Sequence, residues 1–214
     1  MCDGVNRREV ARYLGLKGKS PDARTAALME EAIVELRAAE PRHVLKRFPL
    51  SVEDQTALVG PLTLASKSLA VHVKDCWEVI LLAATLGVKA DMMIRRASVC
   101  DMSRAMVLQA CAAAKLEGYL DSLCAGMEKE LEPEGLSLKT RFSPGYGDLS
   151  LDCQGEVLAL LEAKKRIGLF LTDGSMMVPT KSVTAIIGLT PLKQKSLAHS
   201  CTSCMDADCP YREG

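Results

Sequence analysis

The sequence predicts an α+β fold, and three observations lead to this prediction. The chain has 214 residues and is 48% hydrophobic, so it can bury a core and disorder is not expected. Stretches with the 3.6-residue periodicity of amphipathic helices occur in blocks along the chain. Short stretches typical of strands are scattered between these blocks, whereas a parallel sheet would need strands and helices in regular alternation.

The first 40 residues predict two helices. Residues 6–15 begin with Asn6, which can cap a helix, and end with Gly15, which can stop one. Residues 20–22, Ser-Pro-Asp, combine a cap, a first-turn proline and an acid near the positive end of the helix dipole. A second helix is therefore expected from this point to about Glu40.

The next stretch predicts the centre of a sheet. Residues 43–50 alternate and indicate a strand or an extended arm, and residues 60–61, Gly-Pro, indicate a turn. Residues 65–74 have a helical pattern. Residues 77–87 are a continuous apolar run closed by Gly87, which is typical of a buried central strand.

The second half predicts a long Ala-rich helix from Val88 to about Leu131, with a break near residues 98–101. A further helix is expected at residues 152–163, with Asp152 as its candidate cap. Short strands are expected at three places: residues 136–141, 166–172 and 182–189, the last two joined by a turn around Asp173-Gly174.

Charge and hydropathy argue against several kinds of partner. The 27 basic residues balance the 27 acidic residues, which gives no electrostatic case for nucleic acid or for an anionic membrane. The longest apolar run, Val79 to Val88, is too short to cross a bilayer. The first ten residues contain no apolar core, so an export signal is not expected. A cytoplasmic location is therefore expected.

Nine cysteines are many for such a chain, and their odd number argues against a disulfide framework. Four of them lie in apolar stretches and are expected to be small buried hydrophobic residues: Cys76, Cys100, Cys111 and Cys124.

The most informative stretch is the loop Arg141-Phe142-Ser143-Pro144-Gly145-Tyr146-Gly147-Asp148. Glycine lets the backbone approach a ligand closely, and an arginine can bind a carboxylate through two parallel hydrogen bonds. A tyrosine can stack on a ligand or hydrogen-bond to it. Together they suit a small zwitterionic ligand, although an ordinary turn beside a solvated arginine has the same composition.

RFSPGYGD resembles the R-x-x-P-G-Y signature of the activation region of cobalamin-dependent methionine synthase. Two flanking stretches resemble that region in order and spacing: ATLGVKADMMIRRASVCDMSRAMVLQACAAAKLEGYLD before the loop and KRIGLFLTDGSMMVPTKSVTAIIGL after it. The resemblance covers residues 82–190 and is greatest to the free-standing forms. It implies helices around a twisted antiparallel sheet.

The resemblance also implies a site for S-adenosylmethionine. Arg141 would bind the carboxylate of this cofactor, and Glu117 would meet its ammonium or sulfonium charge. The backbone of Phe142 and the turn Pro144-Gly145-Tyr146 would hold the rest. Two residues of the PTKSV segment would shape the floor of the pocket: Pro179 and Ser182.

The implied function is reductive reactivation of a cobalamin-dependent methionine synthase or a related corrinoid methyltransferase. The chain has no D-x-H-x-x-G stretch, so the partner would hold the cobalamin, and an electron donor of the flavodoxin or ferredoxin type would reduce it. In this interpretation residues 76–190 form the cofactor-binding core, residues 1–75 pack on it, and residues 191–214 form a Cys-rich tail.

The tail carries a second constellation, Cys201, Cys204 and Cys209, with C-x-x-C spacing between the first two. With His199 these thiolates could bind zinc, and with Cys2 or Cys153 they could hold an iron–sulfur cluster. A redox-active dithiol and a plain reduced tail are the other interpretations.

Three rival functions remain open from the sequence. The chain could bind a corrinoid protein without any catalytic part, with a vestigial pocket. It could be an iron–sulfur electron-transfer protein that uses the cysteine tail. It could also serve methyl transfer to a different corrinoid protein.

Overall fold

The computed structural model describes residues 4–16 and 19–191. The helices are α1 (Arg7–Tyr13), α2 (Ala23–Glu35), α3 (Lys67–Val73), α4 (Gly87–Cys100), α5 (Met102–Leu131), α6 (Gln154–Leu160) and α7 (Ala163–Ile167). The 3-10 turns are η1 (Leu36–Ala38), η2 (Glu132–Glu134) and η3 (Leu151–Cys153). The strands are β1 (Arg42–Glu53), β2 (Thr56–Val59), β3 (Leu62–Ala65), β4 (Glu78–Thr85), β5 (Ser137–Leu138), β6 (Phe170–Leu171), β7 (Met177–Val178) and β8 (Ser182–Thr190).

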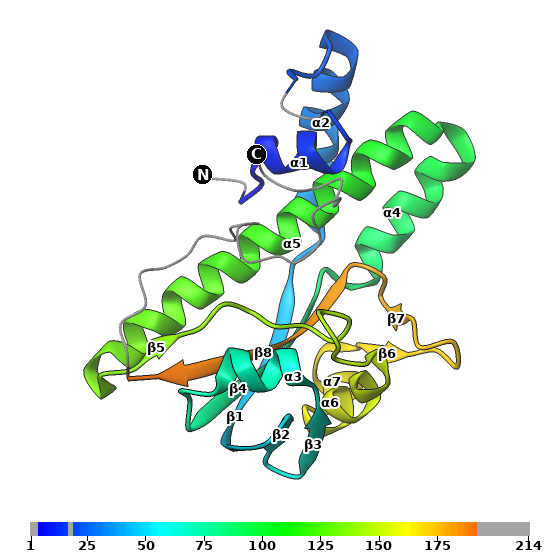
Figure 1. Ribbon diagram of the computed structural model, residues 1–214. Coiled ribbons are helices and arrows are strands. Elements are labelled where there is room, and N and C mark those ends of the chain that lie inside the picture. The colour runs from blue at the N-terminus through cyan, green and yellow to red at the C-terminus, as the bar shows by residue number, and fades with distance from the viewer. Residues whose placement is uncertain (1–3, 17–18, 192–214) are drawn as a thin grey trace.

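A six-stranded antiparallel sheet forms the centre of the molecule, which confirms the predicted α+β class. Its strand order is β3-β2-β1-β4-β8-β5, and β6 and β7 form a separate two-stranded ribbon. The central strand β4 is the apolar run expected from the sequence, and seven of its eight residues are buried. Helices cover the sheet on both faces (Figure 1).

Alternate residues of β4 supply two separate hydrophobic clusters, because successive side chains of a strand point to opposite faces. Ile80, Leu82 and Ala84 belong to the cluster that contains the buried residues of α4 and α5. Val79, Leu81 and Ala83 belong to the cluster with α3, α6 and α7. The long helix α5 and the short helices therefore lie on opposite sides of the sheet.

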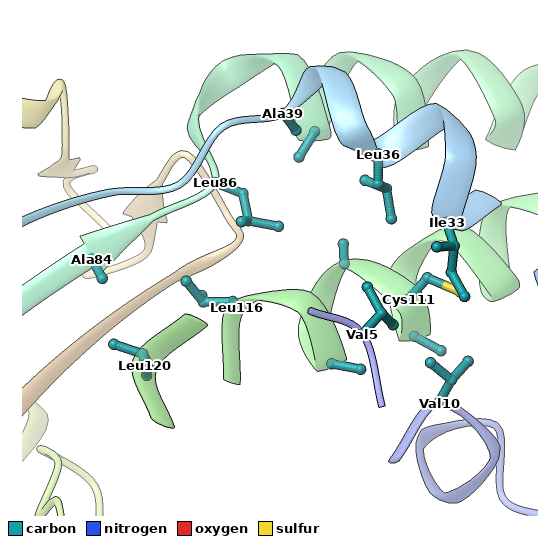
Figure 2. Packing of buried hydrophobic residues seen from close by; sticks show 14 of the residues in the cluster. Val5, Val10, Ile33, Leu36, Ala39, Ala84, Leu86, Cys111, Leu116 and Leu120 are labelled. Atoms are coloured by element: carbon teal, nitrogen blue, oxygen red, sulfur yellow. The ribbon is translucent and has the colours of Figure 1, made fainter. Parts of the chain in front are cut away.

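The N-terminal helices extend the core on the far side of α5. Figure 2 shows Val5, Val10 and Ile33 packed around Cys111 of α5, with Leu36 and Ala39 nearby, and all of these belong to one cluster. The strand β1, which follows them, pairs with β4 along eight residues in the middle of the sheet. Residues 4–16 and 19–75 therefore contribute both a layer over α5 and a central strand.

Most predicted elements are confirmed, and their caps are visible. Asn6 accepts a hydrogen bond from the Arg8 backbone N–H, as expected. The second helix starts later than predicted, since Asp22 and not Ser20 is its cap and accepts from Thr25. Asp152 does not cap α6, which has Cys153 at its N-cap without a side-chain hydrogen bond. Asp101 separates α4 from α5 and caps the second, at the break expected there.

The prediction of a strand at residues 166–172 is largely wrong. Residues up to Ile167 form α7, and only Phe170–Leu171 are extended. Gly168 adopts a left-handed conformation directly after Ile167, as glycine does where helices end. The sequence also missed the pairing of Phe170–Leu171 with Met177–Val178, and it missed β2 and β3 on either side of the expected turn at 60–61.

Cys100 corrects another expectation. Cys76 and Cys111 are buried and Cys124 is half-buried, but Cys100 is exposed at the end of α4. The helix buries only the face that carries Ala90, Ile94 and Ala97, and Cys100 lies off that face. None of the described helices is long and apolar enough to span a membrane.

Candidate ligand-binding site

The loop between β5 and α6 is fixed to the N-terminus of α3 by Asp148. The Asp148 carboxylate accepts hydrogen bonds from Ser66 Oγ at 2.6 Å and from the backbone N–H groups of Lys67 at 2.9 Å and Ser68 at 3.0 Å. The Ser66 hydroxyl and then the Ser68 and Lys67 amides hold the pKa of this carboxyl well below its ordinary value. The partial positive charge at the N-terminus of α3 also favours the ionised form of Asp148.

Two glycines allow the loop to lie this close to α3. Gly145 has φ +93° and Gly147 has φ +54°, which side chains disfavour. A Cβ at Gly147 would lie 2.5 Å from Ser68 Oγ, closer than real atoms come. The loop closes on itself through the Gly145 N–H, which donates to Leu149 O at 2.8 Å.

Arg141, just before this loop, is held by α5. Its side chain is only 8% exposed, and its Nη2 lies 2.8 Å from Glu117 Oε2 while its Nη1 lies 2.9 Å from Asp121 Oδ1. Nη1 is also 3.6 Å from Cys124 Sγ. Glu117 and Asp121 are four residues apart on α5, so both carboxylates lie on the face turned toward Arg141.

Arg141 and Glu117 line a pocket of about 200 Å³. Four of the six residues expected to bind the cofactor lie in its wall: Glu117, Arg141, Pro144 and Tyr146. The other residues in the wall are Ser143, Gln154, Met177, Ser182, Val183 and Thr184. The structure thus brings together side chains from α5, the loop, α6 and the ribbon and strand that follow.

Phe142 and Gly145 are not part of the lining. Both backbone groups of Phe142 bond to Ile186 of β8, with its N–H donating at 2.9 Å and its carbonyl accepting at 2.7 Å. Its ring packs beside His72 and Tyr146, at centroid distances of 5.2 Å and 5.9 Å. Phe142 therefore ties the loop to the sheet, and the cofactor contact expected of its backbone stays a prediction.

The pocket lies along the open edge of β8. Beyond the Phe142–Ile186 bridge, no strand in the described part of the chain pairs with the outer side of Ser182 or Thr184. Both backbone groups of Ile186 point outward, so those of Thr184, two residues earlier, point to the same side. The edge thus offers the pocket further donors and acceptors.

Two polar residues of the pocket lining, Gln154 and Thr184, were not found from the sequence. Gln154 and Thr184 are both buried, and Gln154 Nε2 donates to Thr184 Oγ1 at 3.2 Å. Their signal in the sequence is weak because a glutamine at a helix start and a threonine in a strand are both ordinary. Ser182, expected at the pocket floor, does line the pocket, whereas Pro179 contributes a carbonyl that accepts from Ser182 Oγ at 2.6 Å.

The pocket has a charged end and a neutral end. Arg141 and Glu117 of α5 provide both signs of charge in the lining, and Asp121 pairs with Arg141. Gln154 of α6, on the other face of the sheet, provides only neutral hydrogen-bonding groups, as do Thr184 and Ser182. Such a division fits a zwitterion attached to a neutral polar body. No group of three metal-binding side chains occurs within residues 4–16 and 19–191, and Cys201, Cys204 and Cys209 lie outside the described residues.

Comparison with known proteins gives one informative result. No family model and no curated protein sequence matches the chain. Among solved structures, the chain is similar to the MetH reactivation domain bound to AdoHcy, with a TM-score of 0.66 and 16% identity over 92% of this chain and 77% of that chain. The molecule therefore has the fold of this reactivation domain, as the sequence motifs led us to expect.

Proposed function

We propose that this chain binds S-adenosylmethionine and presents it to a cobalamin-dependent methionine synthase, or a related corrinoid methyltransferase, for reductive reactivation. One observation carries the proposal. The loop that resembles the activation-region signature, together with Arg141 and Glu117, lines a single pocket in a chain with the reactivation-domain fold. A neighbour of that fold has been solved with AdoHcy, the demethylated form of the same ligand.

The residues present fit the amino-acid end of this ligand. The Arg141 guanidinium is buried and already oriented by two carboxylates, so little side-chain entropy remains to be lost on binding. The ligand carboxylate would accept hydrogen bonds from Arg141, and the ligand ammonium would donate hydrogen bonds to Glu117 or Asp121. The internal ion pairs are then exchanged for pairs with the ligand, and no charge is left buried alone.

The remaining lining suits the positioning of the ligand more than acid–base chemistry. S-adenosylmethionine supplies the methyl group, and the partner would hold the cobalamin. The Tyr146 side chain is 55% exposed beside the pocket, so it can pack over a bound ligand without closing the site to a docking protein. Fixing the ligand in one geometry is a large part of the rate enhancement in such a transfer.

A transfer assay tests this function. A methionine synthase that lacks its own reactivation region is incubated under anaerobic conditions with a chemical reductant and S-adenosylmethionine labelled in the methyl group. We expect label on the cobalamin only when this chain is added. Ligand binding without any transfer, in the presence of a docked partner, would instead favour the non-catalytic partner role.

The role of the cysteine tail is a separate proposal. We expect Cys201, Cys204 and Cys209 to bind a metal ion or an iron–sulfur cluster. Metal analysis and visible absorption of anaerobically purified protein, compared with Cys204→Ser, distinguish a cluster, zinc and an unloaded tail.

A further inference from the structure

The wall of the pocket opposite the ion pairs contains a buried side-chain amide. Gln154 is the first residue of α6 and is 5% exposed, and its neighbour Thr184 is 2% exposed. The amide nitrogen is engaged by Thr184 Oγ1 at 3.2 Å. The amide oxygen has no hydrogen-bond partner among the described residues, yet it is not sealed inside the protein, since no buried side-chain atom there is unsatisfied. Gln154 is one of the residues that line the pocket.

In the orientation that the structure shows, this amide offers an acceptor. The Thr184 hydroxyl occupies the nitrogen end, so the oxygen end is the one presented to a ligand. A buried acceptor prefers a ligand that donates a hydrogen bond, because a ligand without a donor leaves the oxygen desolvated and unpaired.

We infer that Gln154 is a specificity-determining residue, whose side-chain oxygen accepts a hydrogen bond from the exocyclic amino group of the adenine. This inference rests on the proposed function. With the amino-acid end of the ligand at Arg141 and Glu117, the nucleoside would extend toward the neutral groups of the same pocket: Gln154, Thr184 and Ser182. The Met177 thioether lies in the same wall and offers a soft surface to a flat ring.

The adenine amino group is the part of the nucleoside that most needs a fixed acceptor. A ribose hydroxyl can both donate and accept, so it would pair equally well with either end of an amide. Replacing the amino group by a carbonyl oxygen, as in hypoxanthine, places two acceptors opposite each other. Sites built to pair with a polar group reject analogues that lack it far more strongly than apolar pockets reject a changed size.

The experiment compares the affinities of S-adenosylhomocysteine and S-inosylhomocysteine by calorimetry. The wild-type chain should bind the adenosyl compound at least about tenfold more tightly. Gln154→Leu should bind the two compounds within about threefold of each other, because neither finds a partner there. Gln154→Glu keeps an acceptor oxygen and should keep the preference. Glu156→Gln, on the exposed face of the same helix, is the matched control, and thermal melting verifies the fold of each variant.

The outcomes separate the inference from the proposed function. Equal wild-type affinity for the two compounds, or an equal weakening of both in a folded Gln154→Leu variant, overturns the assignment of the adenine amino group while leaving the ligand site in place. Absence of wild-type binding to S-adenosylhomocysteine and S-adenosylmethionine overturns the proposed ligand itself, and the inference with it.

Discussion

Arg141 shows how single residues prepare this site. A buried guanidinium paired with two partly exposed carboxylates contributes little net stability, since desolvation of the guanidinium offsets much of the attraction between the charges. It does fix the position of a fork that can bind a carboxylate. The sequence around Arg141 predicted that this arginine and its loop take part in ligand binding. The second carboxylate, Asp121, became evident only once α5 had been placed beside the loop.

Gly147 allows one prediction at the same scale. Gly147→Ala should lower the free energy of unfolding by about 1–3 kcal/mol, because a side chain is disfavoured at φ +54° and its Cβ would collide with Ser68. Urea denaturation measures the change. Gly174→Ala, where the nearest atom to a Cβ is 3.9 Å away, should change the stability by less than about 0.5 kcal/mol. Equal stability of the two variants would show that the close approach to α3 does not hold.

At the scale of elements, the loop and α3 act as one unit through Asp148. Sequence patterns predicted most helices because caps and the 3.6-residue periodicity depend only on residues close together in the chain. They failed at residues 166–172, where Gly168 ends a short helix and the apolar pattern alone is ambiguous between helix and strand. They also missed β2, although it pairs with β1 across a two-residue turn, because a strand of four residues is too short for its pattern to be distinguished from a loop.

Asp148→Asn tests the contact between the loop and α3 through its pH dependence. The folded pKa of Asp148 lies below the unfolded value, so the charge stabilises the protein above the ordinary carboxyl range. This contribution is lost as the pH falls below about 4 toward the folded pKa. We expect wild-type stability to drop more between pH 7 and pH 3 than that of Asp148→Asn, as measured by denaturant unfolding at both values. Parallel pH profiles for the two proteins would rule out the capping role.

At the scale of the whole molecule, the N-terminal segment is part of the core. The backbone of Gly4 passes so close to α5 that a Cβ at Gly118 would lie 2.2 Å from Gly4 O. The sequence predicted that residues 1–75 pack on the core, but it gave no sign of where, because such packing is set by contacts between residues far apart in the sequence, such as Met29 and Cys111, which are 82 positions apart. The pocket had the same difficulty, since Gln154 and Thr184 meet only after folding.

Two glycines of α5 provide a matched pair for this packing. Gly126→Ala should raise the free energy of unfolding by about 0.5–1 kcal/mol, since no atom lies within 4 Å of its Cβ position and alanine favours helix. Gly118→Ala should lower it by about 1–3 kcal/mol, because the segment at Gly4 must move away. Chemical denaturation of both variants decides the point. Stabilisation of equal size at the two positions would mean that the segment does not contact α5 there.

The central claim is that this pocket binds S-adenosylmethionine through Arg141, and one calorimetric titration tests it most directly. Arg141→Lys keeps the positive charge but loses the planar fork, and Arg166→Lys makes the same change at an arginine paired with Glu162 outside the pocket. We predict saturable binding by the wild type and by Arg166→Lys, and affinity weaker by about 10–100-fold in Arg141→Lys. Unchanged affinity in a folded Arg141→Lys variant would contradict the account, as would a wild-type chain that does not bind S-adenosylmethionine.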